Sequence, residues 1–426
     1  MPSERPLTEF IRLEEGPRSL QAYEATGGYQ PLRKALSEMA PTDVTAVVKA
    51  SNLRGRGGAG YPTGQKWGFV PMGADASHPK YLAANADEME PGTFKDRLLM
   101  EGDPHLLIEG MIISSYALEA DAAYIFLRQE YGPSARALKK AIAEAYEAGY
   151  LGKNILGAGY SLELYLHTSA GRYICGEETA LINSLEGKRA NPRSKPPFPP
   201  VIGLWGQSTT VDNVETLCCV PHIVANGADW FRGLGRTKDG GTKLYGASGR
   251  VKRPGIWELP IGTTARELLE EHAGGMRDGL KFRGLLPGGV STEFLIEEQL
   301  DVPMDFDSLQ QYRSRMGTGT MIVLDDKKCP VGMLANIEHF FAQESCGWCT
   351  PCWGGLQWVE QILRAMEEGN GRPGDIEILE MHTERLQMGN TYCALAPGAI
   401  EPLQSALWYF RDDFERHIRE KRCPWR

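Results

Sequence analysis

Short apolar runs alternate with helical stretches over the first 235 residues of this 426-residue chain. Tyr81-Leu-Ala-Ala and Tyr124-Ile-Phe-Leu are continuous apolar runs of strand length, and Ser134–Ala148 has the period of a helix. Such alternation is typical of a mainly parallel sheet covered by helices. We therefore predict an α/β domain over residues 1–235.

The pattern changes over residues 240–325, where the apolar segments become shorter. Leu244–Lys252 and Ile256–Leu259 flank a Pro-Gly pair, which predicts a hairpin. Thr264–Glu267 has the sequence of a capping box that opens a short helix, and Met321–Leu324 has strand character. We predict a small α+β module that is β-grasp-like.

From residue 331 to residue 421 the apolar positions recur with the period of an α-helix. Three sets each share a face: Leu334, Ile337, Phe340 and Phe341; Leu356, Val359, Ile362, Leu363 and Met366; and Leu403, Leu407, Phe410 and Phe414. We predict a helical bundle, with Cys346–Cys352 between the first two helices and Cys393 just before the last.

Composition limits the classes of protein that fit. The chain has 46 basic and 55 acidic residues, a net charge of −9, which argues against a general nucleic-acid surface. Nine cysteines are an odd number for a disulfide framework. No secretory signal is evident, and the most apolar window, Met111–Leu127, is interrupted by Glu119 and Asp121. We expect a cytoplasmic chain that neither inserts into a membrane nor binds nucleic acid.

The cysteines near the C-terminus have the spacing of a metal site. Cys346, Cys349 and Cys352 follow one another at three-residue intervals, and Cys393 comes about forty residues later. An iron–sulfur cubane needs four thiolates, and a C-x-x-C-x-x-C loop with one distant thiol provides them. A structural zinc site also takes four thiolates but favours two separate C-x-x-C pairs. The spacing therefore favours iron, with zinc as the alternative.

A glycine-rich loop lies between Arg54 and Trp67, with five glycines in ten residues. Glycines let the backbone approach a ligand closely and expose amide N–H groups to an anion. Arg56 and Lys66 add positive charge suited to a phosphate. The loop matches neither the dinucleotide fingerprint of Rossmann folds nor a Walker loop. We interpret it as a nucleotide-binding loop, the alternative being a flexible turn.

Polar motifs follow at Asn85–Glu88, Tyr173–Thr179, Lys195–Phe198 and Asp212–Thr216. Asn85 and Asp87 come after a strand-like run, where α/β sheets bind ligands. The neighbouring acids Glu177 and Glu178 open a helical stretch. Each motif also has an ordinary structural interpretation as a turn, an extended loop or a helix cap.

Four of these motifs together resemble a known family. They are RGRGGAGYPTGQKW, NADEMEPGTFKDR, ICGEETALINSLEG and ESCGWCTPC. In this order the chain resembles the flavoprotein subunit (51 kDa type) of bacterial respiratory NADH:quinone oxidoreductase, complex I, over residues 25–420. The resemblance implies a Rossmann-like FMN- and NADH-binding domain at 1–235, a β-grasp-like (SLBB-type) module at 240–325 and a helical [4Fe–4S] domain at 331–421.

The resemblance also implies roles for individual residues. NADH-binding positions are Gly55, Gly57, Gly58, Gly60, Tyr61, Lys66, Phe69, Glu90, Glu178, Lys195 and Phe198. FMN-binding positions are Gly57, Lys66, Asn85, Asp87, Glu88, Tyr173, Gly176, Glu177, Asn213 and Thr216. The cluster ligands are Cys346, Cys349, Cys352 and Cys393. No side chain is assigned to acid–base catalysis, because the cofactors carry the chemistry.

A few positions depart from the pattern of the family. Tyr61 replaces a frequent phenylalanine, and Ala84 and Gln129 replace a cysteine and a glycine. Asp212 replaces an asparagine and places an anion beside the expected flavin site. Trp353 replaces an arginine after Cys352, and losing that positive charge should lower the potential of the cluster.

The implied activity is electron input to complex I: hydride transfer from NADH to FMN, then one-electron transfer to one [4Fe–4S] cluster and on towards quinone. The implied partners are a small thioredoxin-like [2Fe–2S] subunit and a large multi-cluster subunit. The implied location is the cytoplasmic face of the inner membrane, reached through these partners. Two alternatives remain open. One is the diaphorase subunit of an NAD-linked hydrogenase or formate dehydrogenase, and the other is a non-catalytic zinc-stapled scaffold or nucleotide-binding module.

Overall fold

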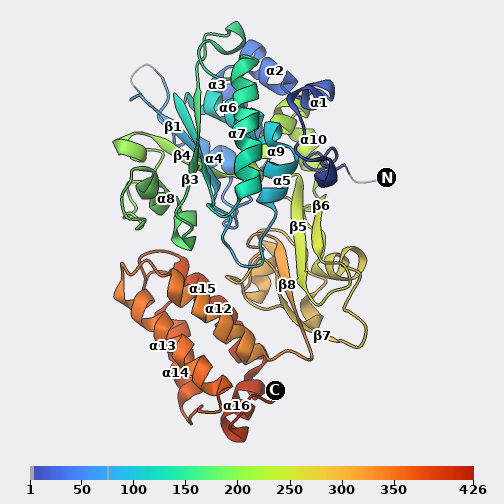
Figure 1. Ribbon diagram of the computed structural model, residues 1–426, viewed down its shortest axis with the longest axis vertical. Coiled ribbons are helices and arrows are strands. Elements are labelled where there is room, and N and C mark those ends of the chain that lie inside the picture. Colours follow the sequence, from blue (N-terminus) through green and yellow to red (C-terminus); the bar gives the residue numbers. More distant parts are fainter. Residues whose placement is uncertain (1–3, 74–75) are drawn as a thin grey trace. The chain divides into compact units, whose positions relative to one another are not determined.

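A computed structural model describes residues 4–73 and 76–426, which divide into two compact units (Figure 1). The first unit holds the residues up to Met89, then Phe94–Leu244 and Glu258–Gly262. The second holds Glu90–Thr93, Tyr245–Trp257 and Thr263–Arg426. The predicted fold class, α/β followed by a β-grasp-like module and a helical bundle, is confirmed. The three domain ranges stay a prediction.

The first unit is built on a four-stranded parallel sheet with the order β3-β2-β1-β4. The strands are β1 (Tyr81–Ala86), β2 (Ala122–Leu127), β3 (Glu163–Thr168) and β4 (Thr209–Asn213). The two apolar runs predicted as strands are β1 and β2, whose side chains are largely buried. Continuous apolar runs are expected of parallel strands that helices cover on both faces.

Helices surround this sheet (Figure 1). In chain order they are α1 (Leu20–Ala25), α2 (Gln30–Glu38), α3 (Pro41–Ala50), α4 (Thr63–Trp67), α5 (Asp96–Gly102), α6 (Pro104–Leu118), α7 (Gly132–Glu147), α8 (Glu178–Leu185), α9 (Val214–Asn226) and α10 (Ala228–Leu234). The predicted helix at 134–148 is α7. The apolar window at 111–127 is the end of the buried helix α6 followed by β2. Within the described ranges, no helix is both long enough and apolar enough to cross a bilayer.

A second sheet has the order β6-β5-β8-β7, and the boundary between the two units runs through β5 and β6. Its strands are β5 (Thr242–Gly249), β6 (Gly255–Pro260), β7 (Phe282–Leu286) and β8 (Thr320–Asp325). β5 and β6 are the two segments of the predicted hairpin, and β8 contains the predicted strand at 321–324. The capping box at Thr264–Glu267 is present and opens the short helix α11 (Ala265–Glu267).

The C-terminal part of the second unit is helical. Its helices are α12 (Pro330–Glu344), α13 (Thr350–Glu367), α14 (Asp375–Arg385), α15 (Leu395–Tyr409) and α16 (Arg411–Glu420). All five apolar residues predicted on one face of the second helix are buried in α13. The prediction was wrong in two details. Phe340 is only half-buried while Glu338 is fully buried, and the last apolar stripe belongs to two helices that meet at Phe410.

Candidate functional site: a nucleotide site at the first sheet and a thiol cluster in the helices

Asn85 and Asn213 lie on neighbouring strands at the point where the strand order of the first sheet reverses. The chain runs outward from β1 through β2 to β3, and then returns to β4 on the other side of β1. In open α/β sheets, ligands bind beyond the carboxyl ends of the strands at such a switch point. Asn85 at the end of β1 pairs in register with Asn213 at the end of β4. The Asn85 side chain donates to the Gly176 carbonyl at 3.0 Å, which joins the segment before α8 to this end of the sheet.

The glycine-rich loop packs against the start of α9. Gly58 has a φ of 120°, a conformation that side chains strongly disfavour. A Cβ on Gly57 would lie 3.2 Å from the Cβ of Asn213, so the loop passes close to the end of β4. The Arg56 N–H donates to Thr216 Oγ1 at 2.8 Å. The loop therefore lies at the positive end of a 13-residue helix, where an anion is stabilised.

A buried network of charges fixes the loop. The Glu215 carboxylate lies 2.7 Å from Lys243 Nζ and 2.9 Å from Lys95 Nζ. Arg56 is fully buried and donates to two main-chain carbonyls, at 2.8 and 3.0 Å. Burial raises the pKa of Glu215, but the charges of Lys243, Lys95 and Arg56 outweigh burial and lower this pKa to about 2. The arginine of the loop thus anchors the loop from inside the protein.

The acids after β1 have protein partners. Asp87 accepts from the Ser169 hydroxyl at 2.8 Å. Glu88 accepts from the N–H groups of Lys95 and Asp96, both at 2.9 Å, and from Tyr131 Oη at 3.0 Å. Burial raises the pKa of the Glu88 carboxyl to about 7. The Glu88 side chain therefore caps α5, which agrees with the alternative interpretation of this motif as a helix cap. Its assignment to flavin binding stays a prediction.

Two lysines bracket the acids at the start of α8. Glu177 caps the helix by accepting from the N–H groups of Thr179 and Ala180, both at 2.9 Å. Lys195 Nζ lies 2.9 Å from Glu177 and 2.7 Å from Glu178. Lys66 Nζ lies 3.5 Å from the other oxygen of Glu178. Burial raises the pKa of Glu178, but the two lysines outweigh burial, so the pKa lies below its usual value.

Asp212 has specific partners that explain how an anion is tolerated here. Its Oδ2 accepts from Trp67 Nε1 at 2.8 Å, and its Oδ1 lies 3.7 Å from Lys66 Nζ. The departure from asparagine thus adds a carboxylate that Lys66 neutralises. Lys66 faces both Asp212 and Glu178 and links the glycine loop, β4 and α8.

The aromatic residues predicted to stack on NADH are exposed. The exposed fractions are 46% for Tyr61, 54% for Phe69 and 54% for Phe198. Tyr61 follows Gly60, whose φ is 63°, and the Gly55 N–H donates to the Tyr61 carbonyl at 2.8 Å. The turn of the loop therefore presents Tyr61 outward. Tyr173 opens the short helical turn Tyr173–Gly176 before α8.

Glu90 is the one predicted NADH residue that belongs to the second unit. Its carboxylate accepts from the Ser291 N–H at 2.7 Å and from the Ser291 hydroxyl at 2.8 Å. The remaining predicted nucleotide residues lie in the first unit.

The four predicted cluster cysteines come together in the helical part of the second unit. Trp348 and Tyr392, which directly precede Cys349 and Cys393, have ring centroids 6.3 Å apart. Burial, together with the neighbouring Cys349, Cys393 and Cys346 thiols, raises the pKa of the Cys352 thiol to about 12. Cys352 lies within the first turn of α13, a correction to its predicted place between helices.

These thiols fit an anionic iron–sulfur cluster. Cys349 is the N-cap of α13, and Cys393 directly precedes the N-cap of α15. Two helix N-termini therefore adjoin the thiols, and their positive ends stabilise a negatively charged group. Three of the cysteines are half-buried and Cys352 is buried, so the donor set is shielded yet lies near the surface.

Comparison with known proteins agrees with this geometry. Family models match the Nuo51 FMN-binding domain at residues 48–222, the SLBB domain at 247–294 and the NADH-ubiquinone oxidoreductase-F iron-sulfur binding region at 332–417. The NADH-quinone oxidoreductase-F protein of Escherichia coli K12 is 58% identical over 98% of this chain and 94% of its own length. The chain belongs to the NADH-quinone oxidoreductase-F family. The member of this family from Mycobacterium bovis is 48% identical over 95% of this chain and 91% of its own length.

A solved structure has the same fold. The crystal structure of an NAD+-reducing [NiFe]-hydrogenase in the H2-reduced state aligns with a TM-score of 0.82 and 34% identity, over 95% of this chain and 67% of that chain. The air-oxidised state of such a hydrogenase aligns equally well, over 94% of this chain and 66% of that chain. As a member of the oxidoreductase-F family, this chain carries its FMN-binding domain and its [4Fe–4S] region.

Some residues that support the candidate nucleotide site were not predicted from the sequence. Lys95, Asp96 and Lys243 are not among the predicted site residues. Lys95 Nζ nevertheless lies 2.6 Å from Asp96 and 3.3 Å from Asn213 Oδ1. Asn213 Nδ2 in turn donates to Asp96 at 2.7 Å. Lys95 and Asp96 lie inside the NADEMEPGTFKDR motif, so that motif was the available signal.

Proposed function

We propose that this chain is the electron-input subunit of a bacterial complex I, in which it oxidises NADH. When bound, FMN accepts a hydride from NADH, and a [4Fe–4S] cluster accepts electrons one at a time. The observation that carries the proposal is the convergence of the glycine loop, Asn85 and the start of α9 at the switch point of the first sheet.

In this proposal the glycine loop and the α9 N-terminus hold the phosphate of FMN. Glycines 55, 57, 58 and 60 leave room for the backbone to approach, and Lys66 supplies a cation close by. Asn85 and Asn213 offer amide groups that can pair with the edge of a flavin ring. Asp87, Tyr173, Gly176, Glu177 and Thr216 complete the FMN side, together with Glu88, which caps α5.

We assign NADH binding to the exposed aromatics and the ionic cluster next to the loop. Tyr61, Phe69 and Phe198 present open ring faces on which an adenine can stack. Glu178 and Lys195 provide polar contacts to the dinucleotide, and Glu90 belongs to the same set by family resemblance. None of these residues transfers a proton, and their task is to orient the dinucleotide for reaction.

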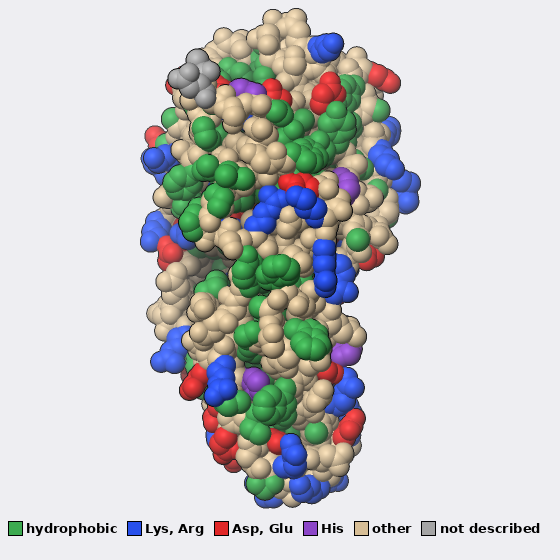
Figure 2. All heavy atoms as spheres, turned by 90° about the vertical axis from the view of Figure 1, so that its left-hand side faces the viewer, with side chains coloured by type: hydrophobic (Ala, Val, Ile, Leu, Met, Phe, Trp, Pro, Cys, Tyr) green, Lys and Arg blue, Asp and Glu red, His purple; other side chains and the backbone are tan. Residues whose placement is uncertain are grey.

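We assign the cluster to Cys346, Cys349, Cys352 and Cys393, and docking of partners to the surface around them. Trp348, Trp353 and Trp358 are 58%, 52% and 47% exposed. Figure 2 shows a face on which hydrophobic side chains lie open to solvent. Exposed aromatic side chains are enriched at protein interfaces. A large multi-cluster subunit and a small thioredoxin-like [2Fe–2S] subunit are the partners we propose, at the cytoplasmic face of the membrane.

Spectroscopy of the full-length chain tests the proposal. We expect flavin absorbance that NADH bleaches under anaerobic conditions, and a low-temperature EPR signal of a reduced [4Fe–4S] cluster. Four iron atoms per chain should accompany one FMN. A colourless protein with zinc in place of iron would support the scaffold alternative and contradict the proposal.

A diaphorase subunit of an NAD-linked hydrogenase is the second candidate, since the hydrogenase structures share the fold. Identity favours complex I, at 58% against 34%. Proteins that co-purify with the tagged native chain decide between the two. Quinone-reductase subunits support complex I, and a [NiFe] subunit supports the alternative.

A further inference from the structure

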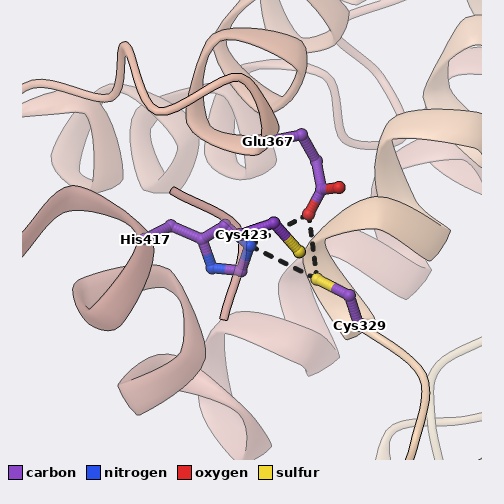
Figure 3. Close-up of side chains that lie close together, drawn as sticks. All are labelled: Cys329, Glu367, His417 and Cys423. Atoms are coloured by element: carbon purple, nitrogen blue, oxygen red, sulfur yellow. Dashed lines mark hydrogen bonds and ion pairs between the residues drawn. The ribbon is translucent and has the colours of Figure 1, made fainter. Parts of the chain in front are cut away.

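A second group of metal-binding side chains lies in the helical region, apart from the four cluster cysteines. Cys329, Glu367, His417 and Cys423 point towards one another (Figure 3). One ligand atom from each residue lies within 4.8 Å of the ligand atoms of the other three. We propose that these four residues bind one Zn²⁺ ion that holds the end of the helical bundle together.

The distances suit a tetrahedral ion. Glu367 Oε1 lies 2.9 Å from His417 Nε2 and 2.9 Å from Cys329 Sγ. His417 Nε2 and Cys329 Sγ lie 3.3 Å apart. Tetrahedral zinc with bonds of about 2.0–2.3 Å places neighbouring ligand atoms roughly 3.3–3.8 Å apart. Small side-chain adjustments therefore make room for the ion.

The histidine is oriented as a ligand. His417 is fully buried, and its Nδ1 lies 2.6 Å from the Asp413 carbonyl oxygen. A carbonyl only accepts, so Nδ1 carries the hydrogen of this bond. Nε2 then faces Glu367 and Cys329. Metal-binding histidines commonly donate their second ring nitrogen to such a carbonyl, which fixes the ring. Trp425 stacks on the ring, with centroids 6.0 Å apart and planes 15° from parallel.

The other ligands are similarly supported. Cys329 is the N-cap of α12, and its Sγ accepts from the Gly332 N–H at 3.2 Å, which fixes the position of the sulfur. The second oxygen of Glu367 lies 3.2 Å from Arg426. Two thiolates and one carboxylate around Zn²⁺ leave one negative charge, which Arg426 offsets. Thiolate and imidazole ligands together favour zinc over magnesium or calcium.

The ligands come from four separate segments of the second unit. Cys329 begins α12, Glu367 ends α13, His417 lies on α16 and Cys423 follows α16. Three of the predicted iron–sulfur cysteines, Cys346, Cys349 and Cys352, lie at the opposite ends of α12 and α13. Helix α12 has 15 residues, about 22 Å of helix. The zinc site is therefore a structural site, remote from the electron-transfer cysteines.

Metal analysis of the holoprotein tests this proposal. We expect one zinc per full-length chain in addition to the iron, and near-complete loss of that zinc in Cys423→Ser and His417→Gln with iron and FMN content unchanged. Two variants are used because His417 is buried and its replacement can impair folding. Cys219→Ser and His382→Gln, which alter a buried cysteine and a buried histidine outside the group, should keep the zinc.

Zinc K-edge absorption identifies the ligands. We expect two sulfur atoms at about 2.3 Å and two lighter atoms at about 2.0–2.1 Å. Three results would overturn the proposal. They are equal zinc content in the wild type and both ligand variants, a zinc atom with four sulfur ligands, and a Cys329–Cys423 disulfide found by mass spectrometry of the alkylated protein.

Discussion

Lys195 Nζ lies 2.7 Å from Oε1 of Glu178. Lys66 approaches the other carboxylate oxygen of Glu178 at 3.5 Å. This carboxylate therefore balances two cations at the place where we propose that the dinucleotide binds. Its removal would leave Lys195 with Glu177 and Lys66 with Asp212, so each lysine would face one carboxylate fewer.

The change Glu178→Gln should raise kcat/KM for NADPH about tenfold, roughly 1.4 kcal/mol of transition-state binding. NADPH carries a 2′-phosphate of about −2 charge, which a nearby carboxylate repels. Glutamine keeps the size of the side chain and removes one of the negative charges that each lysine faces. Steady-state kinetics with both cofactors on the purified variant should show a smaller change for NADH.

Glu186→Gln is the matched control, because Glu186 follows the same helix at its other end and pairs with Lys188 and Arg193. It should leave the NADH/NADPH preference as it is in the wild type. An unchanged preference in Glu178→Gln as well would refute the selectivity role of Glu178.

The change Gly58→Val should abolish retention of FMN. The φ of 120° at Gly58 is disfavoured for any side chain, and a β-branched side chain would also block close approach of the ligand. Flavin content per chain after desalting measures the effect. Gly233→Val, at a helical glycine where an added Cβ would meet no atom within 4 Å, should keep its FMN. A folded Gly58 variant with full FMN would show that this loop does not hold the cofactor.

The change Cys393→Ser should remove the cluster while much of the FMN stays bound. The cysteine lies in the second unit, and the glycine loop with its network lies in the first. We expect loss of the EPR signal, partial survival of NADH oxidation with ferricyanide, and no transfer to quinone in the assembled complex. A normal four-iron signal in this variant would exclude Cys393 as a ligand.

The buried Glu215 predicts a loss of stability in acid. Its pKa of about 2 lies below the ordinary 4.5, because Lys243 and Lys95 outweigh burial. A depressed folded-state pKa stabilises the fold above pH 4.5, and this stabilisation is lost as the pH falls towards 2. The difference corresponds to about 3 kcal/mol.

Glu215→Gln should therefore lower the free energy of unfolding by about 3–5 kcal/mol at pH 7, since it also leaves the buried Lys243 without its carboxylate partner. The difference in the free energy of unfolding between this variant and the wild type should become smaller below pH 4.5. Urea unfolding at a series of pH values measures both. Asp229→Asn, which breaks an exposed ion pair with Arg232, should behave as the wild type at every pH. If this difference in the free energy of unfolding stays constant down to pH 3, the charge of Glu215 does not stabilise the fold.

Local patterns were sufficient to predict elements that have a buried apolar run or one buried apolar face. β1, β2 and α13 were predicted because their apolar residues follow the period of a strand or a helix. α12 shows the limit of this method. Periodicity places polar residues outside, yet Glu338 is fully buried, and neither of its carboxylate oxygens has a hydrogen-bond partner among the described residues. Burial raises the pKa of the Glu338 carboxyl well above its usual value.

Contacts between distant segments were beyond the reach of sequence spacing. Lys95, Glu215 and Lys243 form one network although they lie far apart in the chain. The same holds for Cys329 and Cys423, which have no C-x-x-C spacing to mark them. Family resemblance supplied the candidate site residues, because it carries information on three-dimensional proximity that single motifs lack.

The cap that Glu88 forms on α5 bears on how the holoprotein matures. Its carboxylate accepts from main-chain N–H groups of Lys95 and Asp96, so the segment after β1 draws its fixed shape from the polypeptide itself. A polypeptide of this kind can complete its fold during synthesis and take up flavin afterwards. Stripping the flavin and adding it back should then restore the original spectrum without any step of refolding.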